Sequence, residues 1–187
     1  MSRCASIVFA SVTALIVWPP ALSWAQTSPK DASKPSVEQS ASVWTDPATG
    51  LLWTKQDNGS NVNWNAARNY CAGLTLGGYS GWRLPEIDQL QQIYDKNSTR
   101  TFASLGVTFQ YHIKGGIELT NQQWSNTPVS AADKEKEAAL GKQLGGVELA
   151  NGSDKAWIFD FSVGARFPIE VDVPYNKRAL CVRLAGK

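Results

Sequence analysis

The chain has 187 residues, of which 43% are hydrophobic and 18% charged, and its formal net charge is +2. This balance lacks the concentrated positive charge that binding to phosphate backbones requires, so it argues against a nucleic-acid partner. It also argues against an intrinsically disordered chain, and no apolar stretch after residue 25 approaches the length of a membrane span, so we expect a globular protein of one or two domains.

Residues 1–25 have the pattern of a secretory signal peptide. Arg3 provides a positive start, residues 5–18 form an apolar run, and a small-residue cleavage site ends at Ala25. A retained membrane anchor is the alternative, but the apolar run ends at Pro19-Pro20 and is short for a span. We therefore expect an exported protein, periplasmic or extracellular, without a membrane span after cleavage.

Residues 26–42 are rich in Ser, Pro, Lys, Gln and Ala and contain almost nothing apolar. Such a segment cannot repay the entropy of being ordered, so we expect a flexible tether. The folded domain is then expected to occupy residues 43–187.

The first half of this domain predicts a hairpin followed by two helices. Two β-prone runs, 43–45 and 51–54, flank turn residues, and Asn63 is placed to cap a helix that ends at Gly77-Gly78. The second helix is expected to begin at Pro85, in the first helical position. The residues expected to face the core are Trp64, Ala67, Cys71 and Leu74 on the first helix and Ile87, Leu90 and Ile93 on the second.

The second half predicts mainly strands around one long irregular segment. Residues 126–155 form that segment, in which Ser130 and Asp133 suggest the start of a short solvated helix. The three final strands are expected to form an antiparallel meander, because turn residues separate them. The expected strands are 107–111, 117–119, 122–125, 156–161, 166–173 and 178–184.

After signal cleavage two cysteines remain, Cys71 and Cys181. In an oxidising compartment a pair of thiols tends to form a disulfide, which we expect here; two separately buried thiols are the alternative. The chain contains no CxxC spacing, so a redox-catalytic role is poorly supported.

Five motifs in order resemble the Lcl C-terminal domain family, a secreted bacterial family of unknown function. The resemblance covers roughly residues 43–184 and is carried by the motifs Asp46-Pro47-Ala48-Thr49-Gly50-Leu51-Leu52-Trp53, Trp64 to Cys71, Gly81-Trp82-Arg83-Leu84-Pro85, Trp124-Ser125-Asn126-Thr127 and Ala179-Leu180-Cys181-Val182-Arg183. It implies an α+β, C-type-lectin-like fold, in which two helices pack on a small twisted antiparallel sheet with a long loop insertion and one disulfide. The family's collagen-like adhesins bind carbohydrate, but this chain lacks their collagen-like repeats, so fold analogy does not supply the function.

The long segment and the strand before it supply the candidate ligand-binding residues Trp124, Asn126, Asn151, Asp154 and Arg166. A long loop on a compact domain is often functional, although this one is equally compatible with a solvated decoration. Trp82, Arg83 and Pro85 are interpreted as structural, with Arg83 satisfying backbone carbonyls or an acid such as Asp88.

We expect no metal or other cofactor. Calcium needs several converging oxygen ligands, which Asn126, Asn151, Asp154 and Asp160 could offer, but the sugar-binding signatures of C-type lectins are absent. The single histidine, His112, belongs to no recognisable triad or HExxH spacing.

The preferred hypothesis is an exported, noncatalytic binding or adhesion module whose partner is a glycan or a surface protein. The alternative is a secreted hydrolase that uses a carboxylate pair drawn from Asp57, Asp154 and Asp160. The sequence does not determine the oligomeric state.

Overall fold

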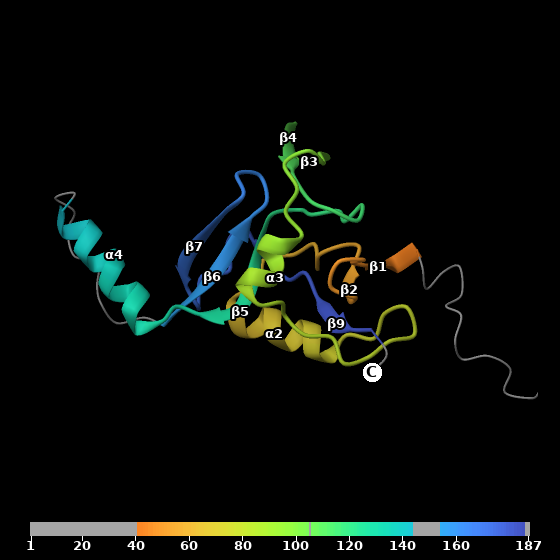
Figure 1. The fold of residues 1–187 in the computed structure, drawn as a ribbon, viewed down its shortest axis with the longest axis horizontal. Coiled ribbons are helices and arrows are strands. Elements are labelled where there is room, and N and C mark those ends of the chain that lie inside the picture. The colour runs from red at the N-terminus through yellow and green to blue at the C-terminus, as the bar shows by residue number, and fades with distance from the viewer. Residues whose placement is uncertain (1–40, 105, 144–153, 186–187) are drawn as a thin grey trace, which may run out of the picture. The chain divides into compact units, whose positions relative to one another are not determined.

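The computed structural model describes residues 41–104, 106–143 and 154–185 (Figure 1). They form a mixed α+β fold with a few helices and several small sheets, as expected. The elements in chain order are β1 (Val43–Thr45), β2 (Leu51–Thr54), α2 (Trp64–Gly73), α3 (Ile87–Gln92), β3 (Arg100–Ser104), β4 (Val107–Tyr111), β5 (Gln122–Pro128), α4 (Ala131–Gln143), β6 (Lys155–Asp160), β7 (Ala165–Glu170), β8 (Lys177–Arg178) and β9 (Val182–Leu184). The signal peptide and nearly all of the tether lie outside the described residues.

The two ends of the domain meet in one sheet of order β1-β2-β9. The predicted hairpin is confirmed, with Trp44 opposite Trp53, and β9 pairs antiparallel with the other edge of β2. The turn depends on Asp46, whose carboxylate accepts hydrogen bonds from the Thr49 hydroxyl (2.6 Å) and the Ala48 amide (3.2 Å). Asp residues favour such turns because their side chains bond the backbone two residues on.

Helix α2 begins as predicted, because the Asn63 side chain accepts a hydrogen bond from the Ala66 amide at 2.9 Å. Ala67 and Cys71 are buried, and Cys71 forms the expected disulfide with Cys181. The predicted end of the helix was wrong: it stops at Gly73, because the next residue, Leu74, adopts an extended backbone.

Helix α3 starts at Ile87, two residues later than predicted, because Glu86 rather than Pro85 precedes the first turn as its N-cap. The Gln89 side chain accepts a hydrogen bond from the Glu86 amide at 3.0 Å. The carboxylate of Glu86 accepts two more bonds, from Asn126 (2.9 Å) and Thr127 (2.7 Å) of β5. The predicted buried face of Ile87, Leu90 and Ile93 is confirmed.

The predicted three-strand meander was wrong in its last strand. The hairpin β6–β7 forms as expected, in a sheet of order β7-β6-β5-β8. The third predicted strand, however, divides into β8, which pairs parallel with β5, and β9, which pairs with β2 in the other sheet. The chain crosses from one sheet to the other between β8 and β9. Ala179, Leu180 and Cys181 are fully buried there, so packing in the core and the disulfide determine this crossing.

The middle of the chain also departs from the prediction. Strand β4 occupies the expected residues, but its partner β3 was missed. The expected strand at 117–119 is absent as a named strand, although Ile117 and Leu119 are buried and a single bridge joins Glu118 to Gln56. The predicted solvated helix is α4, and Ser130 accepts a hydrogen bond from the Asp133 amide at its start.

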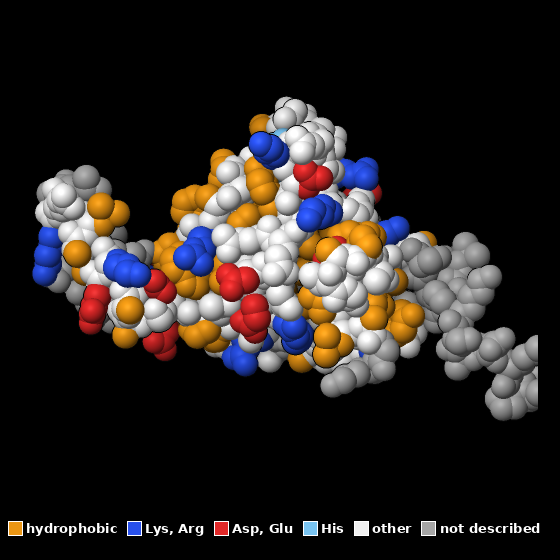
Figure 2. Space-filling model, viewed as in Figure 1, with side chains coloured by type: hydrophobic (Ala, Val, Ile, Leu, Met, Phe, Trp, Pro, Cys, Tyr) orange, Lys and Arg blue, Asp and Glu red, His pale blue; other side chains and the backbone are white. Residues whose placement is uncertain are grey.

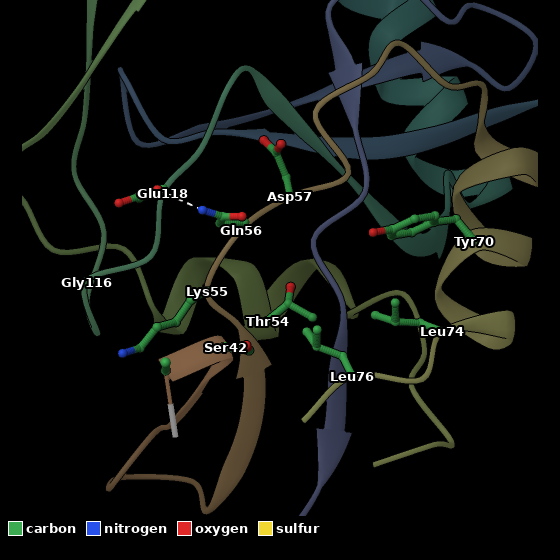
Figure 3. Close-up of a pocket in the computed structure, with 11 residues that line it drawn as sticks. Ser42, Thr54, Lys55, Gln56, Asp57, Tyr70, Leu74, Leu76, Gly116 and Glu118 are labelled. Carbon is green, nitrogen blue, oxygen red and sulfur yellow. Dashed lines mark hydrogen bonds between the residues drawn. The ribbon is translucent and has the colours of Figure 1, made fainter. Parts of the chain in front are cut away.

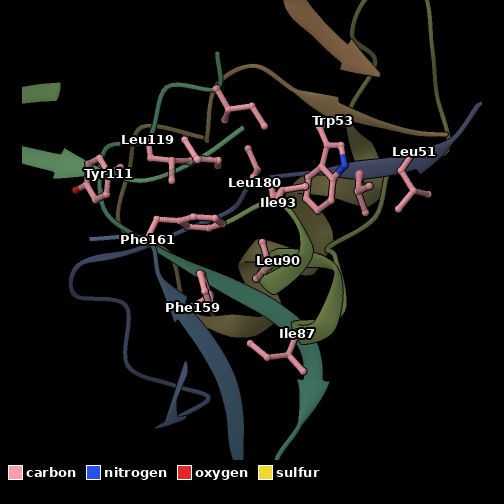
Figure 4. Close-up of a cluster of buried hydrophobic side chains, with 13 residues drawn as sticks. Leu51, Trp53, Ile87, Leu90, Ile93, Tyr111, Leu119, Phe159, Phe161 and Leu180 are labelled. Atoms are coloured by element: carbon pink, nitrogen blue, oxygen red, sulfur yellow. The ribbon is translucent and has the colours of Figure 1, made fainter. Parts of the chain in front are cut away.

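Two hydrophobic clusters form the core. One lies around α3 and includes Trp53, Leu90, Phe159, Phe161 and Leu180 (Figure 4). The other surrounds the disulfide, and its large buried members are Trp82, Leu84, Trp124 and Ile158. No helix among the described residues is long and apolar enough to cross a membrane.

We predict that Glu86→Ala destabilises the domain by about 1.5 to 3 kcal/mol. The substitution leaves the Asn126 and Thr127 side chains without their charged acceptor, and hydrogen bonds to charged groups are worth roughly this much. Urea unfolding measures the change. Asp88→Ala, which removes an exposed acid from the same helix, is the control and should cost less than about 1 kcal/mol; equal losses would contradict the role given to Glu86.

Candidate functional site

A hollow of about 280 Å³ lies between the end of β2 and the end of α2 (Figure 3). One side is formed by Tyr70, near the C-terminal end of α2, and by residues just after this helix. The other side is formed by the segment that continues from β2. The described residues that line it are Ala41, Ser42, Thr54, Lys55, Gln56, Asp57, Tyr70, Leu74, Leu76, Gly116 and Glu118.

The apolar side consists of Tyr70, Leu74 and Leu76, which point toward the opposite segment in Figure 3. Tyr70 precedes the disulfide-bonded Cys71, so the covalent link fixes the turn of helix that carries it. The Tyr70 side chain is 41% exposed, and no hydrogen bond joins its hydroxyl to any described residue. Its ring and hydroxyl are therefore available to a ligand.

The polar side is built from two segments that are distant in sequence. The Glu118 amide donates to the Lys55 carbonyl at 2.8 Å, and the Gln56 side chain donates to the Glu118 carboxylate at 3.0 Å. Gly115 makes this approach feasible: it has a φ of 74°, and a side chain there would collide with the Trp44 ring. The chain thus passes over Trp44 and brings Glu118 beside Gln56.

Asp57 is held in a defined orientation at the inner end of this segment. Its carboxylate accepts hydrogen bonds from the Gly59 amide (2.9 Å), the Thr120 amide (2.7 Å) and hydroxyl (2.8 Å), and the Gln123 side chain (2.9 Å). The group is buried, and these donors compensate the loss of water around its charge. Burial, and secondarily the charge of Asp57, raise the pKa of the Tyr70 hydroxyl.

The carboxylates of the hydrolase hypothesis do not all come together. Burial raises the pKa of the Tyr111 hydroxyl to about 12, and the negative charges of Asp160 and Asp57 add to this rise. Asp160 accepts hydrogen bonds from Gln122 and from the amide and hydroxyl of Ser162. Asp154 is elsewhere, with its side chain 91% exposed and its nearest ion-pair partner, Lys134, at 3.8 Å.

The structure does not assemble the ligand surface expected from the sequence. Trp124 is fully buried and its indole nitrogen donates to the Val62 carbonyl at 2.8 Å, so it cannot offer a ring to a ligand. Trp124 lies opposite Ile158 of β6, whereas Arg166 lies opposite Phe159 of the same strand. Ile158 and Phe159 are consecutive and face opposite sides of the sheet, so Trp124 and Arg166 also lie on opposite faces.

The other predicted residues are also separated. The Asn126 side chain donates to Glu86, the Arg166 guanidinium lies 4.7 Å from the centre of the Trp157 ring, and Asn151 lies outside the described residues. Figure 2 shows acidic and basic side chains interspersed on the viewed face, without a single charged patch.

The motif of Trp82, Arg83 and Pro85, which the sequence predicts to be structural, is packed and hydrogen-bonded to residues nearby in the chain. Trp82 is buried and donates to the Tyr79 carbonyl at 3.0 Å, and Pro85 is buried. Arg83 donates to the Leu84 carbonyl and to the Gln89 side chain, so the backbone alternative is confirmed and Asp88 is not its partner. Among the described residues, no group of three His, Cys, Asp or Glu side chains could hold a metal ion.

Sequence reasoning missed Tyr70, Gln56 and Glu118. The only local signal was the position of Tyr70 beside an inward-facing cysteine, on the margin of the buried stripe of α2. Gln56 and Glu118 are 62 residues apart, and no short-range pattern places them together.

We predict that stability falls as the pH rises from about 10 to 12, and that Tyr111→Phe reduces this fall. The folded protein retains the Tyr111 proton up to about pH 12, whereas an unfolded tyrosine releases it near pH 10. The stabilisation is therefore complete below pH 10 and is lost as the pH passes through the folded pKa. Urea midpoints across this range measure it, and Tyr175→Phe, at a largely exposed tyrosine, is the control; identical alkaline profiles for both variants would contradict the assignment.

One comparison with known proteins identifies a family for this chain. No curated protein matches it, but the family described as Lcl C-terminal domain matches residues 42–183. This match runs from the start of the first hairpin into the last strand and includes both disulfide-bonded cysteines. The chain therefore belongs to the Lcl C-terminal domain family.

Proposed function

We propose that the protein is an exported, noncatalytic binding module that holds a glycan in the hollow beside Tyr70. The observation that carries the proposal is the combination of a partly exposed aromatic ring, two leucines and the Gln56 and Glu118 side chains around one small hollow. Small-molecule sites are typically concave and combine an apolar surface with a few placed polar groups. A sugar ring has an apolar C–H face and hydroxyl edges, so it fits both sides of such a site.

Export is supported by the disulfide as well as by the first 25 residues. Both cysteines are fully buried and bonded, and such structural disulfides persist in oxidising compartments. A periplasmic or extracellular location follows from this proposal. Adhesion to glycans on a surface is the role that such a module would serve there.

A C-type-lectin-like arrangement is the finer fold that we propose. It is supported by the pairing of the first hairpin with the last strand, and by the disulfide from α2 to the residue before β9. The second sheet, β7-β6-β5-β8, then carries the insertion that contains α4 between β5 and β6. In this proposal the hollow, rather than that insertion, binds the ligand.

The test is a glycan array probed with the full, disulfide-bonded protein. We expect reproducible binding to at least one glycan, and at least a tenfold loss of affinity in Tyr70→Ala, which is about 1.4 kcal/mol. Tyr70→Ala removes the ring of the apolar side, while its exposure leaves folding little affected. Tyr175→Ala, at an exposed tyrosine that is not part of the lining, is the matched control and should bind normally.

A second variant separates the hollow from the long insertion. Replacing residues 133–149 with a short Gly-Ser linker should leave folding and affinity unchanged if the ligand occupies the hollow. A folded linker variant that loses binding would move the site to the insertion. No binding on the array, or full binding by Tyr70→Ala, would reject the proposed function.

A further inference from the structure

We propose that the β3–β4 hairpin binds the surface of a membrane that contains anionic lipids, with its apolar end inserted among the headgroups. Three features of the hairpin support this contact: its exposed apolar side chains, the distribution of charge along it, and the spacing between the two. No described residue of 96–114 lines the hollow, so this surface is separate from the proposed glycan site.

The hairpin projects from a fixed base. Among the described strands, β3 and β4 pair only with each other, and Figure 1 shows them apart from the other two sheets. The base is held by the core, because Tyr111 is buried and the His112 amide donates to the Phe161 carbonyl at 2.9 Å. The rest of β4, residues 107–110, is exposed.

One face of the hairpin is apolar from the core outward. Phe102 lies opposite Phe109, and Tyr111 and Val107 share their face because side chains alternate along a strand. Val107 is 53% exposed and Phe109 is 40% exposed. Apolar side chains that are grouped on one exposed face, unlike isolated ones, mark a surface that contacts a partner.

The end of the hairpin lacks the usual protection of an exposed strand. Edge strands generally carry charged residues or proline, which prevent pairing with other chains. The edge strand β7 follows this rule, since it contains Arg166, Pro168 and Glu170. Residues 101–111 contain no charged residue and no proline. This composition suits an end that leaves water when the protein binds its partner.

Positive charge is concentrated at the base of the hairpin. The charged residues of segment 96–114 are Lys96, Arg100 and Lys114, so this segment carries three positive charges and no acid, although the formal net charge of the whole chain is only +2. Lys114 is placed at the base by its amide, which donates to the Ile93 carbonyl at 3.0 Å. Basic residues next to an apolar element attract it to anionic lipids.

The spacing along the strands matches the layers of a membrane surface. Arg100 lies opposite Tyr111, the Phe102–Phe109 pair lies two residues farther out, and Val107 lies four residues farther out. At about 3.4 Å per residue, these apolar side chains extend about 7 and 13 Å beyond Arg100. Interfacial segments bury apolar groups roughly 5 to 10 Å deep while their basic side chains remain at the headgroups.

The outer edges of the hairpin limit the depth of insertion. Both strands pair on one side only among the described residues, so the other edge of each presents unpaired backbone groups. Such groups are costly in hydrocarbon but can bond to headgroups and water at the membrane surface. The hairpin therefore suits the boundary between headgroups and acyl chains.

The same features disfavour two other partners. A second copy that paired through the same hairpin would bring the Arg100 side chains and their basic neighbours together, and like charges repel. The nearby Asp95 offsets only one of these charges, and its carboxylate accepts a hydrogen bond from the Asn97 amide at 3.0 Å. An acidic peptide would satisfy the charges but would leave the apolar end of a projecting hairpin in water.

Cosedimentation with lipid vesicles tests the inference. The exported, disulfide-bonded protein is mixed with vesicles of phosphatidylcholine alone, or with vesicles in which half of the lipid is phosphatidylglycerol. We expect at least tenfold stronger binding to the anionic vesicles. This advantage should shrink as salt is added, because salt screens the charges at the base of the hairpin.

Two variants test the apolar end. Phe109→Ala removes an exposed ring and should weaken binding to the anionic vesicles at least fivefold. Phe167→Ala is the matched control, because Phe167 is 42% exposed but lies on β7, and it should bind normally. Val107→Glu places a negative charge at the end of the hairpin and should abolish binding. Urea midpoints establish that each variant is folded.

A pair of charge variants tests the base. Lys96→Glu should weaken binding to the anionic vesicles at least threefold. Lys136→Glu makes the same change in net charge at an exposed lysine of α4, and should leave binding unchanged. Equal losses in the two variants would mean that net charge alone attracts the vesicles, which contradicts a specific role for the hairpin.

The remaining outcomes would also overturn the inference. Full binding by folded Phe109→Ala and Val107→Glu would reject insertion of the apolar end, even if Lys96→Glu weakened the contact. Dimers in sedimentation velocity that Val107→Glu disrupts, without binding to vesicles, would assign this face to a second copy. Binding to polyglutamate but not to vesicles would assign it to an acidic peptide. The proposed glycan site is unaffected by each of these results, because Tyr70→Ala tests it separately.

Discussion

The disulfide between Cys71 and Cys181 is the constraint on which the rest of the structure depends. It joins α2 to the residue before β9 across a separation of 110 residues. Thr54 strengthens the same junction, since its amide donates to the Cys181 carbonyl at 3.0 Å and its hydroxyl accepts from the Cys181 amide at 3.2 Å. The first hairpin, the first helix and the last strand therefore meet at one buried point, and a loop of this length stabilises the fold by about 4 to 5 kcal/mol in the chain-entropy view.

The hollow follows from this junction. Its apolar side continues from the turn of α2 that carries Cys71, and its polar side continues from β2 just after Thr54, so both sides start at the same anchored point. A site fixed in this way requires little ordering when a ligand binds, which favours affinity. The binding proposal thus depends on the same contacts that hold the domain together.

Buried polar groups stabilise the segments that line the hollow, but one of them lacks a hydrogen-bond partner. Gln123 is fully buried and donates to both Asp57 and the Asn121 carbonyl, yet its own carbonyl oxygen has no hydrogen-bond partner among the described residues. An unsatisfied buried acceptor costs roughly 1 to 3 kcal/mol. Gln123 still contributes to the frame, because its side-chain nitrogen helps to hold the Asp57 carboxylate in one orientation.

The sequence by itself determined the local features, because turn, cap and helix preferences depend on residues close together in the chain. It predicted the first hairpin, the Asn63 cap, the buried Ala67 and Cys71 of α2, the buried face of α3, the disulfide and the family. Only the tertiary structure decided that 178–184 divides between two sheets, that Trp124 is buried, and that Tyr70, Gln56 and Glu118 surround one hollow. The physical reason is that strand partners and cavity walls are chosen by contacts between distant segments, and hydrophobic periodicity shows that a residue such as Trp124 is apolar without showing which neighbours will cover it.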